Sequence, residues 1–202
     1  MDTKFRNYLL KDSNQVVSFS AIDDEFLPQM QHKGDAGADL KLYLDDDSFL
    51  KPSYIKQFLT DARLHGAKIF RDGVDISRGE NTSGCCGVFL KPNKTVIVRT
   101  GLKIQLPKPA NGLVYLFKIY GRSGYGFKHG ITLTNSVGIV DSNFEGEIMV
   151  SLINHGSNYH LLTRGSRIAQ GIIERVIYQE WFLDYTKDDS LREANGFGSS
   201  GS

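Results

Sequence analysis

The chain has 202 residues, with 24 lysines and arginines against 23 aspartates and glutamates, so its formal net charge is only +1. This balance excludes a surface built mainly to bind a nucleic-acid backbone or an anionic membrane. Apolar residues make up 40% of the chain and charged residues 23%, which predicts a packed core and a single domain over residues 1–202. The longest apolar runs, such as residues 113–117, are far too short to span a bilayer, so we expect no membrane association.

The N-terminal residues and the cysteines together indicate the compartment. Residues 1–15 interleave charged and apolar side chains and lack the continuous apolar stretch of a secretory signal, so we expect a cytoplasmic protein. Cys85 and Cys86 are adjacent, a spacing that does not suit ordinary disulfide geometry. We therefore expect neither a disulfide scaffold nor a cysteine-based zinc site.

A polar region over about residues 45–92 contains the helix that the sequence predicts. Apolar residues within 53–65 recur at i, i+3, i+4 and i+7, with Pro52 before them and Gly66 after them, as in an amphipathic helix. The region also begins with three consecutive aspartates at 45–47. Hard-cation loops need spaced ligands, so this run favours a solvated loop over a metal site.

Much of the remaining chain alternates apolar and polar residues with period two. The alternation is clearest over residues 96–106, 148–152 and 167–182, and glycine or asparagine separates these segments. Several short strands joined by turns predict an all-β sandwich or barrel.

Two segments could carry chemistry. GRSGYGFKHG, residues 121–130, places Arg122, Ser123 and Lys128 among four glycines, which suits anion binding but also suits a glycine-rich turn with a solvated arginine. Further along, Asp141 follows an apolar strand and precedes a turn, where it could act as a general base or simply cap the turn. The residues alone leave both alternatives open.

The C-terminal residues NGFGSSGS, 195–202, have the composition of a linker or a frayed terminus. Phe197 fits that interpretation poorly, because a lone aromatic ring in such a tail has no core to join. The alternative is a tail that closes over something.

Five segments, taken in order, resemble the five motifs of the trimeric dUTP pyrophosphatases. They are DAGADL (35–40), GRSGYGFKHGI (121–131), VGIVDSNFEGEI (137–148), RGSRIAQGI (164–172) and REANGFGSSG (192–201). The resemblance implies a jelly-roll-like β-barrel, a homotrimer whose active sites each draw on three chains, and hydrolysis of dUTP to dUMP and pyrophosphate with Mg²⁺. Residues 45–92 would then be an insertion between the first two motifs, and residues 192–202 a flexible lid.

The same resemblance implies roles for individual residues. Asp141 would be the general base that activates the attacking water, and Asp39 would steer the metal through a water molecule. The phosphates would be bound by Arg122, Ser123, Gly124, Gln170 and, at the distal end, Arg192. Uracil would be read by the segment Gly138, Ile139, Val140 and Asp141 with Asn135, and Met149 would lie nearby. Phe144 would pack against the deoxyribose, and Phe197 would stack on the base, with Gly198 and Ser199 closing beside it.

The sequence departs from the family pattern at some positions within the motifs. Phe144 stands where tyrosine is more common, and Ser166 stands where an acidic residue is common. The largest departure is the length of the 45–92 region, which predicts a folded segment rather than an ordinary loop.

Two alternatives remain. A dCTP deaminase would share the fold, but the position that matches its proton-shuttling glutamate is Ser151, which cannot transfer protons in that way. The second alternative is a dUTPase that also binds a regulatory protein through the 45–92 insertion.

Overall fold

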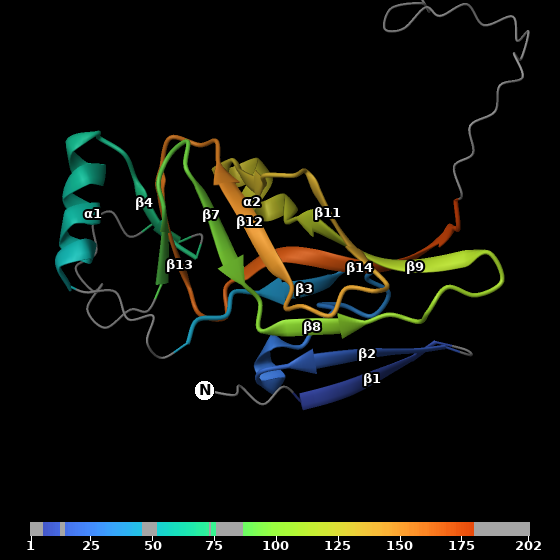
Figure 1. The fold of residues 1–202 in the computed structure, drawn as a ribbon. Coiled ribbons are helices and arrows are strands. Elements are labelled where there is room, and N and C mark those ends of the chain that lie inside the picture. The colour runs from blue at the N-terminus through green and yellow to red at the C-terminus, as the bar shows by residue number, and fades with distance from the viewer. Residues whose placement is uncertain (1–5, 13–14, 46–51, 73, 76–86, 180–202) are drawn as a thin grey trace, which may run out of the picture.

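The computed structural model describes residues 6–12, 15–45, 52–72, 74–75 and 87–179. Strands dominate these ranges, joined by two α-helices and a short 3₁₀ helix at Asp24–Phe26, so the predicted all-β, jelly-roll-like class is confirmed (Figure 1). Neither described helix has the length and apolar character needed to cross a membrane.

The strands form four sheets. One has the order β11 (Val137–Asp141), β9 (Leu113–Gly121), β14 (Arg167–Ile177) and β3 (Ala38–Lys41). A second has β5 (Val74–Asp75), β4 (Ile69–Arg71), β13 (Tyr159–Thr163) and β6 (Gly87–Leu90). The two three-stranded sheets are β10 (Ile131–Leu133), β12 (Met149–Asn154) and β7 (Thr95–Arg99), and β1 (Arg6–Asp12), β2 (Gln15–Ala21) and β8 (Leu102–Gln105).

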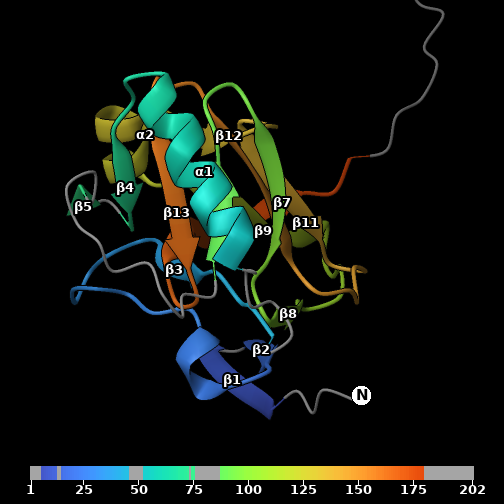
Figure 2. The ribbon, with the colours of Figure 1, turned by 90° about the vertical axis from the view of Figure 1, so that its left-hand side faces the viewer.

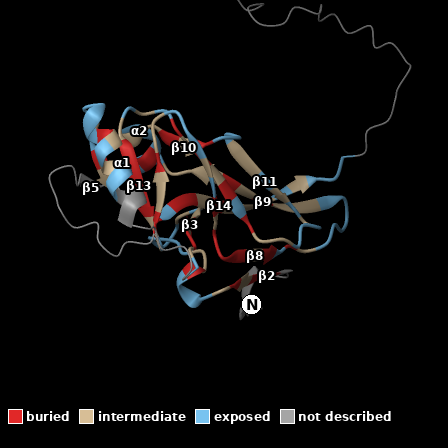
Figure 3. Cartoon of the chain, turned by 60° about the vertical axis from the view of Figure 1, so that its left-hand side comes forward, coloured by how far each residue is buried: buried red, intermediate tan, exposed pale blue. Residues whose placement is uncertain are grey.

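The core follows the period-two alternation of the sequence. On β8 and the residues just beyond it, Leu102, Ile104 and Leu106 are at most 4% exposed, while Gln105 between them is exposed. The same alternation buries Val150 and Leu152 of β12. These residues belong to one core cluster, so hydrophobic burial holds the sheets together. Figure 3 shows the buried face of β8 in red.

The predicted helix is α1, Pro52–Leu64, one residue from the expected start. Phe58 and Ala62 are buried on its inner face and pack with Ile69 of β4 and Tyr159 of β13. The ring of Phe58 lies edge-on to that of Tyr159, with centroids 5.1 Å apart. Figure 2 shows α1 in front of β13 with β4 to its left, so this small second core joins the helix to the body of the fold.

The described part of the 45–92 region contributes strands as well as α1. Strand β4 pairs in parallel with β13, and β6 pairs antiparallel with its other edge. The region is therefore continuous with the sheet that contains β13. The cysteine pair at 85–86 and the expected strand residues beyond 179 lie outside the described residues.

The glycine-rich segment at 121–130 is a short helix rather than a turn. Helix α2 spans Ser123–His129 and ends at Gly130, whose φ of +70° gives the left-handed cap that glycine adopts without strain. The side chain of Tyr125, within this helix, is buried. Burial of this ring and the glycine cap outweigh the weak helix propensity of two internal glycines.

Candidate functional site

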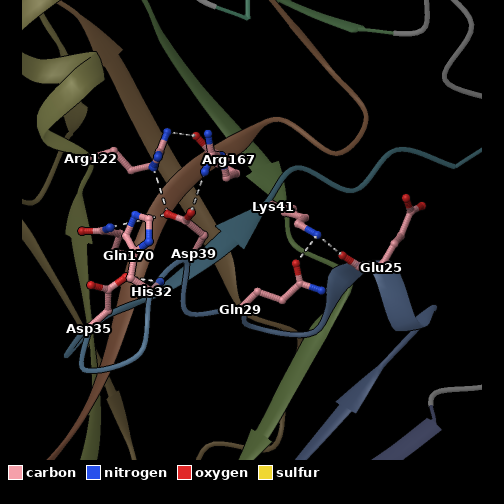
Figure 4. A network of polar contacts seen from close by, with 9 residues as sticks. All are labelled: Glu25, Gln29, His32, Asp35, Asp39, Lys41, Arg122, Arg167 and Gln170. Carbon is pink, nitrogen blue, oxygen red and sulfur yellow. Dashed lines mark hydrogen bonds and ion pairs between the residues drawn. The ribbon is translucent and has the colours of Figure 1, made fainter.

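A buried carboxylate lies on β3, in the sheet formed by β11, β9, β14 and β3, and accepts hydrogen bonds from several side chains. Asp39 on β3 is only 1% exposed, and its Oδ1 accepts a hydrogen bond from Arg122 Nε at 2.9 Å (Figure 4). Its Oδ2 accepts from Arg167 Nη1 at 3.3 Å, and Gln170 Nε2 lies 3.5 Å from Oδ1. Three of the predicted residues, Asp39, Arg122 and Gln170, therefore meet at one place.

A cationic cavity of about 490 Å³ opens beside this network. Arg122, Gly124 and Lys128 line it from the α2 segment, and Arg167 lines it from the start of β14. Ser123, at the first position of α2, is exposed. Guanidinium groups and an ammonium around an open cavity provide the directed donors that phosphate oxygens accept.

Two further titratable groups of this cavity stay neutral at ordinary pH. Burial raises the pKa of Tyr125 to about 12, and Asp72 adds to the effect. Burial also lowers the pKa of His129, and the charge of Lys128 lowers it further. The positive charge of the cavity therefore comes from its arginines and Lys128.

The predicted base-reading residues line a separate cavity of about 460 Å³. Its lining includes Asn135, Gly138, Ile139, Val140, Asp141, Phe144 and Met149. Ile139 and Met149 are 61% and 55% exposed, so the cavity has an open apolar wall. Among the described strands β11 lies at the edge of its sheet and pairs only with β9, which leaves one row of its backbone N–H and C=O groups available to a ligand.

Asp141 lies at the end of β11 with its side chain exposed. Its backbone carbonyl accepts a hydrogen bond from the Phe144 N–H at 3.1 Å, which confirms the predicted change from strand to turn at this residue. The Phe144 ring lies over Gly146, where an added Cβ would come within 2.6 Å of the ring. The absence of a side chain at Gly146 thus leaves room for the Phe144 ring, which lines the same cavity as Asp141.

The two cavities lie far apart within one chain. In the pairing of β11 with β9, Asp141 is opposite Leu116, whereas Arg122 follows the far end of β9. Six residues of extended strand separate these positions, which corresponds to roughly 20 Å at the usual rise per residue. A general base must come within hydrogen-bond reach of the water it activates. Asp141 and Arg122 of the same chain therefore cannot act on one phosphate group.

The sequence also predicts Mg²⁺, and the described residues fit one way of binding it. No group of three histidine, cysteine or carboxylate side chains among them could hold a metal ion. Both oxygens of Asp39 already accept hydrogen bonds, so it does not offer itself as a direct ligand. Mg²⁺ loses its water reluctantly and is usually held by substrate phosphates. The site suits an ion that arrives with the phosphates, and the role of Asp39 through water stays a prediction.

Four predicted site residues, Arg192, Phe197, Gly198 and Ser199, lie outside the described residues, as does the predicted lid. Arg167 and Asp72 are among the residues at the cationic cavity that the sequence did not identify as site residues. Arg167 belongs to the RGSRIAQGI segment, so the motif held a signal for it. Asp72 lies in the 45–92 region and had no such signal.

Comparison with known proteins agrees with these features. A family model described as dUTPase matches residues 84–201. The deoxyuridine 5'-triphosphate nucleotidohydrolase of Hahella chejuensis is 40% identical over 129 residues, which cover 63% of this chain and 82% of the relative. The enzyme of the same description from Pseudomonas aeruginosa strain LESB58 is 43% identical over 113 residues, 56% of this chain and 72% of the relative.

Solved structures share the fold. The Staphylococcus bacteriophage 80alpha dUTPase with dUPNHPP superposes with a TM-score of 0.62 at 17% identity, covering 94% of this chain and all of the other. The dUTPase from phage phi11 of S. aureus, which has a species-specific insert, gives a TM-score of 0.57 at 13% identity over 87% of this chain and 99% of its own. The fold is thus a jelly-roll-like all-β fold that these structures share. With the family model matching more than half of its length, the chain belongs to the dUTPase family.

Proposed function

We propose that the protein hydrolyses dUTP to dUMP and pyrophosphate. The observation that carries this proposal is the cavity in which a solvent-exposed carboxylate, Asp141, ends an edge strand beside an open apolar wall. Membership of the dUTPase family supports the same reaction. Such an enzyme keeps uracil out of DNA and supplies dUMP for thymidylate synthesis.

In this proposal, uracil enters the cavity along β11. The free backbone groups of residues 138–140 pair with the edge of the base, and Asn135 contributes its amide. A buried hydrogen-bond pattern of this kind rejects cytosine, because its donors and acceptors are reversed and would leave polar groups unpaired. Phe144 covers the sugar, and Asp141 removes a proton from the water that attacks the α-phosphorus.

The phosphates bind in the cationic cavity of a neighbouring copy of the chain. This follows from the separation of roughly 20 Å between Asp141 and Arg122 within one chain, which a homotrimer with shared active sites would close. Arg122 with Ser123 and Gly124 grips the phosphates, and Gln170 lies beside them. The chemistry that a bound Mg²⁺ would supply is neutralisation of phosphate charge, which would favour departure of pyrophosphate. The part that Asp39 plays is to hold Arg122 in place and, through water, to steer the ion.

A substrate panel tests the proposal directly. Pyrophosphate release is measured with dUTP, dCTP, dTTP and UTP side by side, in the presence of Mg²⁺, and ammonia release is measured with dCTP. Selective release of pyrophosphate from dUTP is the expected result. Ammonia from dCTP, or equal turnover of UTP, would contradict it.

The role of Asp141 has its own test. Asp141→Asn keeps the shape of the side chain but cannot accept the proton, so we expect turnover to fall by about 10² to 10⁴. Binding of a non-hydrolysable dUTP analogue should remain within a few-fold of the unsubstituted protein. If binding is lost together with turnover, Asp141 has a structural role instead.

A further inference from the structure

Asp72 lies directly after β4 and contacts the turn that joins β13 to β14. Its backbone N–H donates to the carbonyl oxygen of Leu161 at 3.0 Å, which continues the parallel pairing of β4 with β13. Its φ of +48° lies in the left-handed region, which aspartate enters more readily than most residues. The 45–92 region thereby delivers a carboxylate to a turn more than ninety residues away in the sequence.

Both oxygens of this carboxylate are used by the turn. Oδ1 accepts from the Thr163 backbone N–H at 2.9 Å and from the Ser166 hydroxyl, and Oδ2 accepts from the Thr163 hydroxyl at 2.5 Å. Within the turn, the Ser166 N–H donates to the Thr163 carbonyl at 3.0 Å. Charge-assisted hydrogen bonds are stronger than neutral ones, so three of them fix the conformation of residues 163–166.

Arg167 is the next residue after this turn, and it contacts both Arg122 and Asp39. Its carbonyl oxygen accepts from Arg122 Nη1 at 3.4 Å, and its own guanidinium pairs with Asp39. Asp72, Arg122 and Arg167 all line the cationic cavity. A displacement of the turn therefore moves both arginines.

We propose that Asp72 is a positioning residue for triphosphate binding: it fixes the 163–166 turn and, through it, the two arginines of the cationic cavity. This inference rests on the proposed function, because it takes that cavity as the phosphate site. It assigns the 45–92 region a part in the active site, although the region lies outside all five motifs.

The charge of Asp72 and its positioning role predict opposite changes. A carboxylate beside bound phosphates repels them, so loss of its charge alone would tighten triphosphate binding and lower the KM for dUTP. Loss of positioning would instead raise this KM, because the arginines no longer converge. The direction of the change separates the two effects.

The test compares Asp72→Ala with Asp61→Ala. Asp61 belongs to the same region, but its carboxylate accepts from Lys91 Nζ at 2.6 Å and the Tyr159 hydroxyl at 3.2 Å, away from the cationic cavity. In Asp72→Ala we expect the KM for dUTP to rise about tenfold while the dissociation constant of deoxyuridine, which lacks phosphates, stays unchanged. Asp61→Ala should leave both quantities unchanged. An unchanged or lower KM in Asp72→Ala, or equal weakening of deoxyuridine, would overturn the proposal.

A second variant tests the assignment to the turn. The Thr163 N–H lies 2.9 Å from the Ser166 hydroxyl oxygen, so a carboxylate at position 166 could accept the same hydrogen bond. The double variant Asp72→Ala/Ser166→Asp should bring the KM back to within about threefold of the unsubstituted protein. A folded double variant whose KM stays as high as that of Asp72→Ala would overturn the proposal.

Binding of inorganic tripolyphosphate with Mg²⁺, measured by calorimetry, keeps this inference separate from the proposed reaction. If the unsubstituted protein leaves dUTP intact, the proposed function fails. Weaker tripolyphosphate binding by Asp72→Ala than by Asp61→Ala would still support the positioning role, and equal binding would overturn it.

Discussion

Asp39 shows how much of the candidate site depends on single residues. Asp39→Ala removes the acceptor that holds Arg122 and Arg167, whose side chains are 23% and 44% exposed. Because water can reach both guanidinium groups, we expect a loss of about 1–3 kcal/mol in the free energy of unfolding, below the cost of a fully buried charge. Urea unfolding measures this loss, and pyrophosphate release from dUTP should fall with it. Asp35→Ala is the control, because within the described part of the chain its carboxylate accepts from the His32 N–H in an exposed turn.

His160 makes stability depend on pH. The residue is 1% exposed, both ring nitrogens lack a hydrogen-bond partner among the described residues, and Phe70 and His129 pack around it, with Lys128 the charged neighbour of His129. Burial, with a smaller effect of His129, lowers the pKa of His160 to about 4. Between this value and the unfolded value of about 6.5, only the unfolded chain binds the proton. Stability is therefore lost as the pH falls through this window, by roughly 3 kcal/mol in total.

The measurement is the free energy of unfolding as a function of pH for His160→Phe beside the unsubstituted protein. The phenylalanine ring can stack on Phe70 but binds no proton, so the variant should lose less stability between pH 6.5 and 4. His155→Asn, at an exposed position, should follow the unsubstituted protein. Parallel pH curves for His160→Phe and the unsubstituted protein would contradict the assignment.

Among individual residues, the sequence predicted those whose place in the fold is indicated by their immediate neighbours. Asp141 was predicted between a strand and a turn, because its neighbours show where the alternation stops. The partners of Asp39 lie 83 and 128 residues away, and no local pattern encodes such a pairing. Asp72 was missed for the same reason, since its acceptor role appears only once β4 lies beside β13.

Elements that bury one face of a periodic sequence were predicted from that period. Elements that depend on particular contacts between residues were not. Helix α1 and the alternating strands each bury one face, and the apolar period records that face. Helix α2 contains two internal glycines and forms because Tyr125 is buried and Gly130 caps the end. Parallel pairing of β4 with β13 was equally beyond the sequence, because residues 69–71 and 159–161 lie far apart in the chain and no local pattern encodes their contact.

The contact between β14 and β9 gives a prediction at the same scale. Gly171 on β14 faces the Phe117 ring, and an added Cβ would lie 2.0 Å from the ring. Phe117 is 1% exposed and cannot move into solvent, so Gly171→Ala should destabilise the protein by about 1–3 kcal/mol or more. Thermal unfolding measures the effect. Gly37→Ala, whose Cβ would meet its neighbours at an ordinary 3.6 Å, should change stability far less, and Gly171→Ala/Phe117→Leu should recover part of the loss.

For the whole molecule, the decisive feature is that the proposed base and the proposed phosphate-binding residues line two separate cavities of one chain. The cavity of Asp141 and the cavity of Arg122 share no lining residue, and the β11–β9 register holds them roughly 20 Å apart. No side-chain motion closes that distance. Under the proposed function, a second copy of the chain supplies the missing half, and Ile139 and Met149 leave an exposed apolar wall beside Asp141.

Mixing two inactive variants tests this arrangement. Asp141→Asn lacks the base and Arg122→Gln lacks the phosphate grip, so each alone should release little pyrophosphate from dUTP. If sites form between the chains of a trimer, each mixed trimer has one interface with both intact residues, so about a third of the original turnover should return in the purified mixed assemblies. Co-expression with two affinity tags, followed by tandem purification and a turnover assay, measures the recovery. Simple mixing of preassembled homotrimers is the control and should stay inactive. Mixed assemblies without recovered turnover would place both halves of the site in a single chain.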